Sequence, residues 1–147
     1  MGRARRLARD LHGGVAGLLL GAGVSGLVPS AFAAGADRVF LADDPRLASY
    51  VTLPYARVVS DLVRAEAPQV LLLGATAVGR DLAPRLSAML QTGLTADCTD
   101  LRIETGSTRR GDDSREGPLL HQIRPAFGGN VVATIVTPHH SPQMATV

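Results

Sequence analysis

Apolar and polar positions along the first ninety residues follow two alternating patterns. Short apolar runs, each long enough for one buried strand, lie at 15–20, 38–42 and 69–73. Between them, apolar residues recur every three or four positions, which is the spacing of one face of a helix. The predicted helices cover residues 3–12, a stretch after the turn at 21–26 that reaches about 34, residues 54–67, and a stretch that ends near 91. This order predicts parallel strands joined by right-handed crossovers.

The strand at 69–73 begins the strand–turn–helix unit with the clearest pattern. Gly74 breaks the strand, and Leu82, Leu86 and Met89 then recur at helical spacing. The loop 92–98, which returns the chain to the sheet, carries hydroxyls, a carboxylate and a thiol. Small-molecule sites in parallel α/β folds form at turns of this kind, so the loop is a candidate site.

The last third of the chain has a different pattern. Leu101 and Ile103 alternate with polar residues, as in a half-exposed strand. Residues 119–124 and 131–137 are also typical of strands, and the Gly-Gly-Asn sequence at 128–130 predicts a tight hairpin between them.

Two further stretches of this region lack apolar periodicity. Residues 106–117 are charged, which predicts an exposed loop or a hairpin tip. The last ten residues have no period, so no strand or helix is predicted there. We therefore expect an α/β fold with a Rossmann-like, mainly parallel sheet and a C-terminal antiparallel extension, built as a single domain over residues 1–147.

Composition narrows the possible functions. The net charge is only +2 and acids are interspersed with the arginines, so a nucleic-acid-binding surface is not expected. The apolar runs are too short to cross a membrane, and four glycines interrupt the only stretch that resembles a secretory signal. Cys98 is the single cysteine, which excludes an internal disulfide. No catalytic residues are identified, because no P-loop, catalytic triad or pair of catalytic carboxylates is found.

The turn GAGVSG at 21–26 has two readings. Gly21, Gly23 and Gly26 match the GxGxxG of a dinucleotide site, and Asp43 follows about twenty residues on, where a ribose-binding acid belongs. The turn would then bind a pyrophosphate at the start of the next helix. Alternatively, small residues merely allow a tight turn between strand and helix in a glycine-rich chain.

Other candidate residues also have a structural alternative. Asp97 either acts as a base or, as we favour, braces a turn, and the Cys98 thiol is expected to be buried. Arg124 precedes a proline, which favours an extended backbone; it either clamps a phosphate or partner carboxylate, or forms a structural ion pair. His139 and His140 lack further metal ligands and are expected in a solvated loop.

Several motifs occur together in one order along the chain. GRDLAPRL begins at residue 79, TGLTADCT at 92, RPAFGGN at 124, and the chain closes on PQMATV. In this combination the sequence resembles the alpha subunit of electron transfer flavoproteins. The motif residues, and hence the interface candidates, are Arg80, Asp81, Thr92, Thr95, Asp97, Arg124 and Asn130.

The resemblance implies an adenine-nucleotide-hydrolase-like three-layer sandwich and a function in electron transfer. Proteins of this family are heterodimers of alpha and beta subunits. They take electrons from acyl-CoA or other dehydrogenases and pass them to an acceptor through FAD, which the C-terminal domain of the alpha subunit binds. The N-terminal domain packs against the beta subunit. The motifs are closest to the group that includes bifurcating and nitrogen-fixation-linked members, and the resemblance implies a prokaryotic, cytoplasmic electron carrier.

The sequence also departs from the family pattern. The family's opening strand and the acidic, glycine-containing segment after it are not found before Gly2, and the chain ends at Val147, before the FAD-binding domain. We therefore expect a sheet that lacks a central strand, exposes an apolar edge and is poorly soluble without its partner. The alternatives are a dinucleotide-binding oxidoreductase domain that uses the GAGVSG turn, and a stand-alone adenine-nucleotide-binding module.

Overall fold

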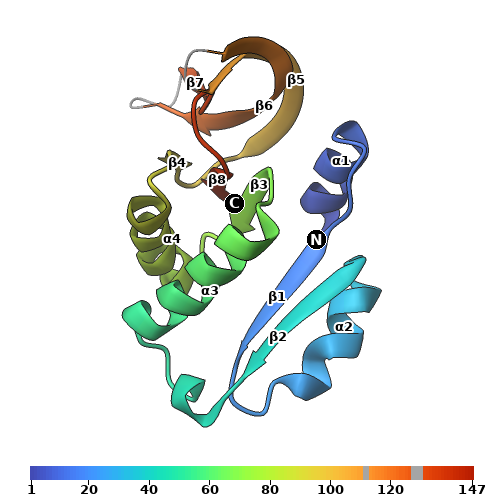
Figure 1. Cartoon of the computed structure of the whole chain (residues 1–147), viewed down its shortest axis with the longest axis vertical. Helices are drawn as coiled ribbons and strands as arrows, with labels where there is room; N and C mark the ends of the chain where they lie inside the picture. The colour runs from blue at the N-terminus through green and yellow to red at the C-terminus, as the bar shows by residue number, and fades with distance from the viewer. Residues whose placement is uncertain (111–112, 127–130) are drawn as a thin grey trace. The chain divides into compact units, whose positions relative to one another are not determined.

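The computed structural model describes residues 1–110, 113–126 and 131–147. The chain divides into two compact units, Met1–Val58 and Val59–Val147, and each is described by itself below. Figure 1 shows the elements along the chain, coloured from the N-terminus to the C-terminus. Parallel and antiparallel strands are both present, and the fold is α/β, as the hydrophobic pattern predicted.

The first unit contains a two-stranded parallel ladder. Its register runs from Ala16 opposite Arg38 to Gly21 opposite Asp43. The stretch after the predicted turn at 21–26 is only partly α-helical, because a 3₁₀ turn comes first and the helix that follows has six residues. The elements of this unit are α1 (Gly2–Asp10), β1 (Ala16–Gly21), η1 (Ser25–Leu27), α2 (Val28–Ala33), β2 (Arg38–Asp43), η2 (Pro45–Leu47) and the first turns of α3 (Thr52–Glu66).

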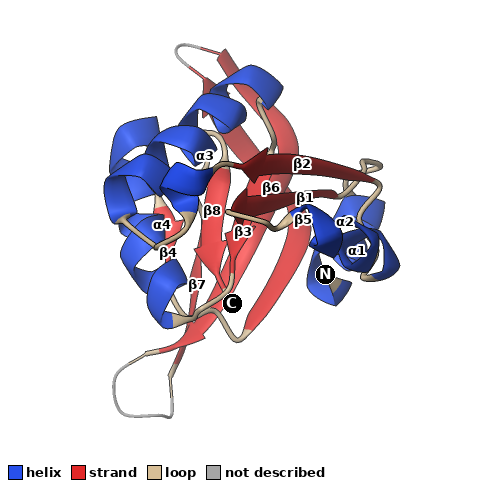
Figure 2. Cartoon of the chain, turned by 90° about the horizontal axis from the view of Figure 1, so that it is seen from below, coloured by secondary structure: helices blue, strands red, loops and turns tan. Residues whose placement is uncertain are grey.

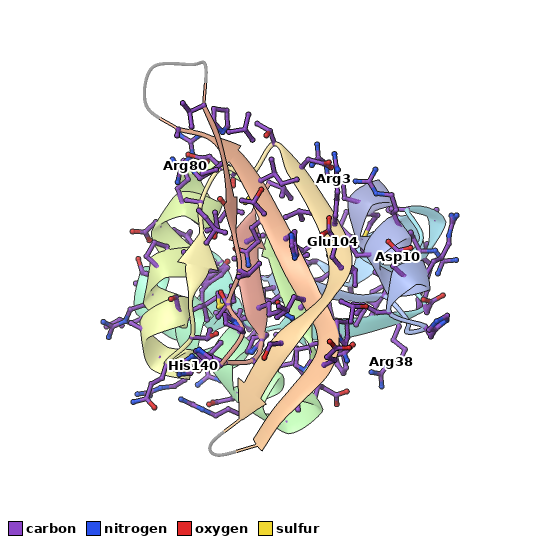
Figure 3. All side chains as sticks on the ribbon, turned by 90° about the horizontal axis from the view of Figure 1, so that it is seen from above. Arg3, Asp10, Arg38, Arg80, Glu104 and His140 are labelled. Atoms are coloured by element: carbon purple, nitrogen blue, oxygen red, sulfur yellow. The ribbon has the colours of Figure 1, made fainter. Side chains whose placement is uncertain are left out.

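Helix α1 is amphipathic, as its pattern predicted. Leu7 and Ala8 are buried, whereas Arg3 and Asp10 project from the helix (Figure 3). The Arg5 guanidinium pairs with the Asp37 carboxylate at 2.6 Å, just before β2. The same carboxylate accepts a hydrogen bond from the backbone N–H of Val15. This bond first, and then Arg5, hold the pKa of Asp37 below its ordinary 3.8.

The second unit combines a parallel and an antiparallel sheet, drawn as red arrows in Figure 2. The parallel sheet has the order β3-β8-β4 and the antiparallel sheet the order β5-β6-β7. The antiparallel sheet is the C-terminal extension that the sequence predicted. The elements are β3 (Val70–Leu73), α4 (Ala77–Leu90), β4 (Leu94–Thr95), β5 (Asp100–Arg110), β6 (Asp113–Pro125), β7 (Val132–Ile135) and β8 (Gln143–Thr146).

Helix α4 begins and ends at residues suited to these positions. The Thr76 hydroxyl caps its first turn by accepting a hydrogen bond from the Gly79 N–H at 3.2 Å. Gln91 closes the helix in the left-handed conformation. The buried face carries Leu82 and Leu86, as their spacing predicted. Gly79 lies against the turn after β3, where a Cβ would overlap the Gly74 carbonyl oxygen.

The sequence predicted no strand or helix in the last ten residues, and this prediction was wrong. Strand β8 lies there, between β3 and β4, with all four residues buried. A strand that is buried on both faces has no polar–apolar alternation. In β8, two of the four residues are polar, so the segment is not a continuous apolar run either. Both are hydrogen-bonded: the Thr146 hydroxyl accepts from the Asp97 N–H, and the Gln143 side-chain oxygen accepts from the Leu120 N–H.

Of the two alternatives predicted for residues 106–117, the hairpin tip agrees with the described residues, whereas a loop without strands was wrong. Strand β5 extends to Arg110 and β6 starts at Asp113, with these two residues paired. Charged residues can form strands because the hydrogen bonds of the ladder join backbone groups. The strand expected at 119–124 lies within β6, and residues 132–135 of the strand expected at 131–137 form β7. The predicted tight turn at 128–130 lies outside the described residues.

Candidate functional site

The GAGVSG turn between β1 and η1 binds a carboxylate of the protein itself. Asp43, at the end of β2, accepts hydrogen bonds from the Gly23 N–H at 2.6 Å and the Ser25 N–H at 3.0 Å. Outward-pointing backbone N–H groups of this kind are the donors that a pyrophosphate would need. Asp43 therefore acts as an internal anion in the turn, and a ribose hydroxyl would have to compete with these two bonds.

Local geometry explains why two of the three glycine positions in this turn are occupied by glycine. Gly23 has a φ of +70°, which favours glycine, and a Cβ on Gly21 would lie 2.6 Å from the Val24 side chain. Gly26 has open space around it. The turn opens onto a 3₁₀ segment and a six-residue helix, so it lacks the long helix of a dinucleotide fold. The structural reading of GAGVSG is favoured over the nucleotide-binding one.

Replacing Asp43 by alanine tests this assignment. The change removes the acceptor of two exposed N–H groups, which water then solvates, so we expect a loss of about 0.5–2 kcal/mol in unfolding free energy. Urea unfolding followed by circular dichroism measures it. Asp10→Ala, at the solvent-exposed end of α1, is the matched control and is expected to have no destabilising effect. A nucleotide-binding role for Asp43 would instead appear as loss of NAD or AMP binding without loss of stability.

Asp44, the neighbour of Asp43, forms a separate pair with Arg46. The guanidinium binds the two carboxylate oxygens at 2.9 and 2.7 Å, and the Arg46 backbone N–H donates to the same group. The side-chain bond first and the backbone bond second lower the pKa of Asp44 from 3.8 to about 2. The pair is a local brace of η2.

This pKa shift predicts a pH dependence of stability. Since the folded state holds the pKa below its ordinary value, the contribution of Asp44 is complete above about pH 4 and is lost as the pH falls towards 2. The effect is expected to be small because the pair is exposed. The difference in unfolding free energy between wild type and Asp44→Asn, followed by circular dichroism, should be constant above about pH 4 and shrink as the pH falls towards 2. A difference between the two proteins that is the same at pH 2 as at pH 7 would contradict the assignment.

The loop 92–98 holds the C-terminal strand of the second unit. The Thr92 hydroxyl donates to the Pro142 carbonyl at 2.8 Å. The Asp97 N–H donates to the Thr146 hydroxyl at 2.8 Å, and the next residue, Cys98, donates its N–H to the Thr146 carbonyl. Asp97 thus braces a turn, with a left-handed φ of +56°, which agrees with the structural reading of this residue.

The other candidates in this region differ in exposure. Thr92 and Thr95 are buried, so their side chains serve the interior of the second unit. Arg80, on α4, reaches the Asp97 carboxylate at 3.1 Å and remains 61% exposed; Figure 3 shows its side chain at the surface. Asp81 is also exposed on α4. The structure therefore brings Arg80 and Asp97 together, and an interface role for these residues stays a prediction.

Arg124 is not part of this loop cluster. Arg124 lies on β6 opposite Ala133 of β7 and is half-buried. Among the side chains that the structure describes, no ion-pair partner of Arg124 is found, so the choice between a clamp and a structural ion pair stays open. Asn130 lies outside the described residues.

The chemistry available in the described ranges is limited. Cys98 is buried and its thiol points to the Thr95 carbonyl at 3.6 Å. Among residues 1–110, 113–126 and 131–147, no three His, Cys, Asp or Glu side chains gather where they could hold a metal. Over the same residues, every helix is too short or too polar to traverse a bilayer. Sequence reasoning missed Gln143 and Thr146; only the closing PQMATV motif pointed to them.

These features define a class of protein: a Rossmann-like α/β domain whose candidate nucleotide turn is closed by its own aspartate. The chain belongs to the electron transfer flavoprotein domain family, whose model matches residues 1–147.

Similarity to curated proteins extends over the whole chain. It is 46% identical over 147 residues to an electron transfer flavoprotein subunit alpha of Thermoanaerobacterium thermosaccharolyticum, covering 100% of this chain and 41% of that protein. Protein FixB of Clostridium saccharobutylicum is also 46% identical, with the same coverage. The LctC subunit of a lactate dehydrogenase (NAD(+),ferredoxin) of Acetobacterium woodii is 43% identical over 100% of this chain and 32% of its own length. The chain thus spans less than half of these relatives.

Proposed function

We propose that the chain is the N-terminal domain of an electron transfer flavoprotein alpha subunit and serves as a scaffold. The observation that carries this proposal is the alignment of all 147 residues with 41% of a protein named as that subunit. The Asp43 carboxylate in the GAGVSG turn supports it, because the donors that could hold a dinucleotide are already used. The chain would position other components rather than carry out bond chemistry.

The components to be positioned are a beta subunit and an FAD domain. Electrons would pass from acyl-CoA or other dehydrogenases to the FAD and then to a further acceptor. The FAD would be held by the remainder of a full-length subunit, and the complex would act in the cytoplasm. Arg80 and Asp81 are the motif residues that suit an interface with a partner, since both are exposed on α4.

Co-purification tests the proposal. A tagged copy of this chain is expressed together with the beta subunit encoded in the same genome, and the stoichiometry is measured by size-exclusion chromatography with light scattering. We expect a 1:1 complex. Replacing Arg80 and Asp81 together by alanine should weaken it, whereas Arg64→Ala and Asp61→Ala, an exposed pair on α3, serve as the control. Absence of a complex with a folded chain would contradict the scaffold role.

A ligand titration separates the scaffold role from the nucleotide-binding alternatives. FAD, NAD and AMP are added to the purified chain, and fluorescence and thermal shift are followed. We expect no saturable binding of any of the three. Saturable binding of NAD or AMP that is lost in Gly23→Ala would restore the GAGVSG turn as a ligand site.

A further inference from the structure

The centre of the antiparallel sheet contains a buried amide. Gln122 lies on β6, opposite Leu101 of β5 and Ile135 of β7. Residues directly opposite one another in a sheet place their side chains on the same face. The Gln122 side chain is fully buried, as are Leu101 and Leu120 beside it. A polar group therefore occupies a position whose surroundings would suit leucine or methionine.

This amide is not satisfied by the protein. Neither the side-chain nitrogen nor the side-chain oxygen of Gln122 has a hydrogen-bond partner among the residues that the structure describes. Buried polar groups in native proteins are almost always paired, because burial without a partner forfeits the hydrogen bonds made to water in the unfolded chain. An apolar side chain of the same size would avoid this cost. A glutamine at this buried position therefore points to a ligand that can both donate and accept.

A second buried glutamine shows what a satisfied amide looks like in the same region. The Gln143 oxygen accepts from the Leu120 N–H at 2.7 Å, and Leu120 is two residues before Gln122 on β6, about 7 Å along the strand. Because that oxygen is already bonded to β6, the Gln143 side chain is held in place by the sheet. Gln143 thus provides a matched control, similar in chemistry and burial but with a defined partner.

We propose that Gln122 forms an internal hydration site, with one ordered water molecule as its ligand. Water is the chemistry that fits, since one molecule accepts from the Gln122 N–H and donates to the Gln122 oxygen. A side chain of another protein cannot reach an amide that has no exposed surface. Such sites are common: roughly one buried water occurs per 27 residues of a globular protein. The site is independent of the electron-transfer role.

Water-to-amide cross-relaxation measured by NMR tests this site in the wild-type chain. We expect the side-chain N–H₂ protons of Gln122 to show a cross peak to a water molecule that stays bound for longer than a nanosecond. The cross peak should persist in Gln143→Met. Slowly exchanging Gln122 amide protons without such a cross peak would overturn the proposal, as would a crystal structure in which both amide atoms bond to protein groups.

Thermal unfolding of two variants gives a second readout. If water satisfies the amide, Gln122→Met loses those hydrogen bonds and gains apolar packing, so its midpoint is expected to stay within about 2 °C of the wild type. Gln143→Met leaves the Leu120 N–H unpaired, so its midpoint is expected to fall by several degrees. A midpoint for Gln122→Met well above that of the wild type would mean that the amide is unhydrated, and would overturn the proposal.

Discussion

Gly79→Ala is expected to destabilise the second unit by about 2 kcal/mol. The added Cβ would overlap the Gly74 carbonyl oxygen, which is backbone and cannot rotate away, so α4 must move from the turn that follows β3. Overpacking of this kind costs roughly 1–3 kcal/mol and sometimes more. The higher helix propensity of alanine returns only about 1 kcal/mol. The steric term should therefore dominate, and urea unfolding followed by circular dichroism measures the net change.

Gly26→Ala is the matched control for this experiment. A Cβ at Gly26 meets nothing within 4 Å, so this variant should unfold within about 0.5 kcal/mol of the wild type. If Gly79→Ala proved as stable as Gly26→Ala, the contact between the start of α4 and the turn at Gly74 would not be as close as the structure shows.

Deleting residues 143–147 is expected to abolish cooperative folding of the second unit. This removes β8, so β3 and β4 lose the strand that lies between them. The Met144 side chain is fully buried, and its burial alone contributes about 2–3 kcal/mol to the free energy of unfolding. The acceptors of the Asp97 and Leu120 N–H groups also disappear. Together these losses approach the whole stability of a small domain.

Amide NMR spectra of the shortened chain measure this effect. We expect the resonances of residues 59–142 to collapse into the narrow range of an unfolded chain. Met144→Leu, a substitution that nearly conserves volume, should cost under about 1.5 kcal/mol and keep the native spectrum. Well-dispersed resonances for β3 and β4 in the shortened chain would show that these strands do not depend on β8.

The GAGVSG turn shows which question the sequence left open. The spacing of Gly21, Gly23 and Gly26 and the position of Asp43 were visible in the sequence, but both readings of the motif used the same residues. Hydrogen bonds favour the structural reading, since the Asp43 carboxylate accepts from the Gly23 and Ser25 N–H groups. Likewise, Arg80 and Asp97 were separate candidates, and the fold pairs them across 17 residues.

The sequence by itself determined the alternation of strands and helices, the amphipathic faces of α1 and α4, the antiparallel C-terminal extension and, through its motifs, the family. These features are local or periodic, so they can be read within one turn of helix or a few residues of strand. Only the tertiary structure decided that β8 lies between β3 and β4, that Asp43 closes the GAGVSG turn, and that Gln122 is buried without a hydrogen-bond partner among the described residues. Each of these depends on residues far apart in the chain, whose pairing no local period encodes.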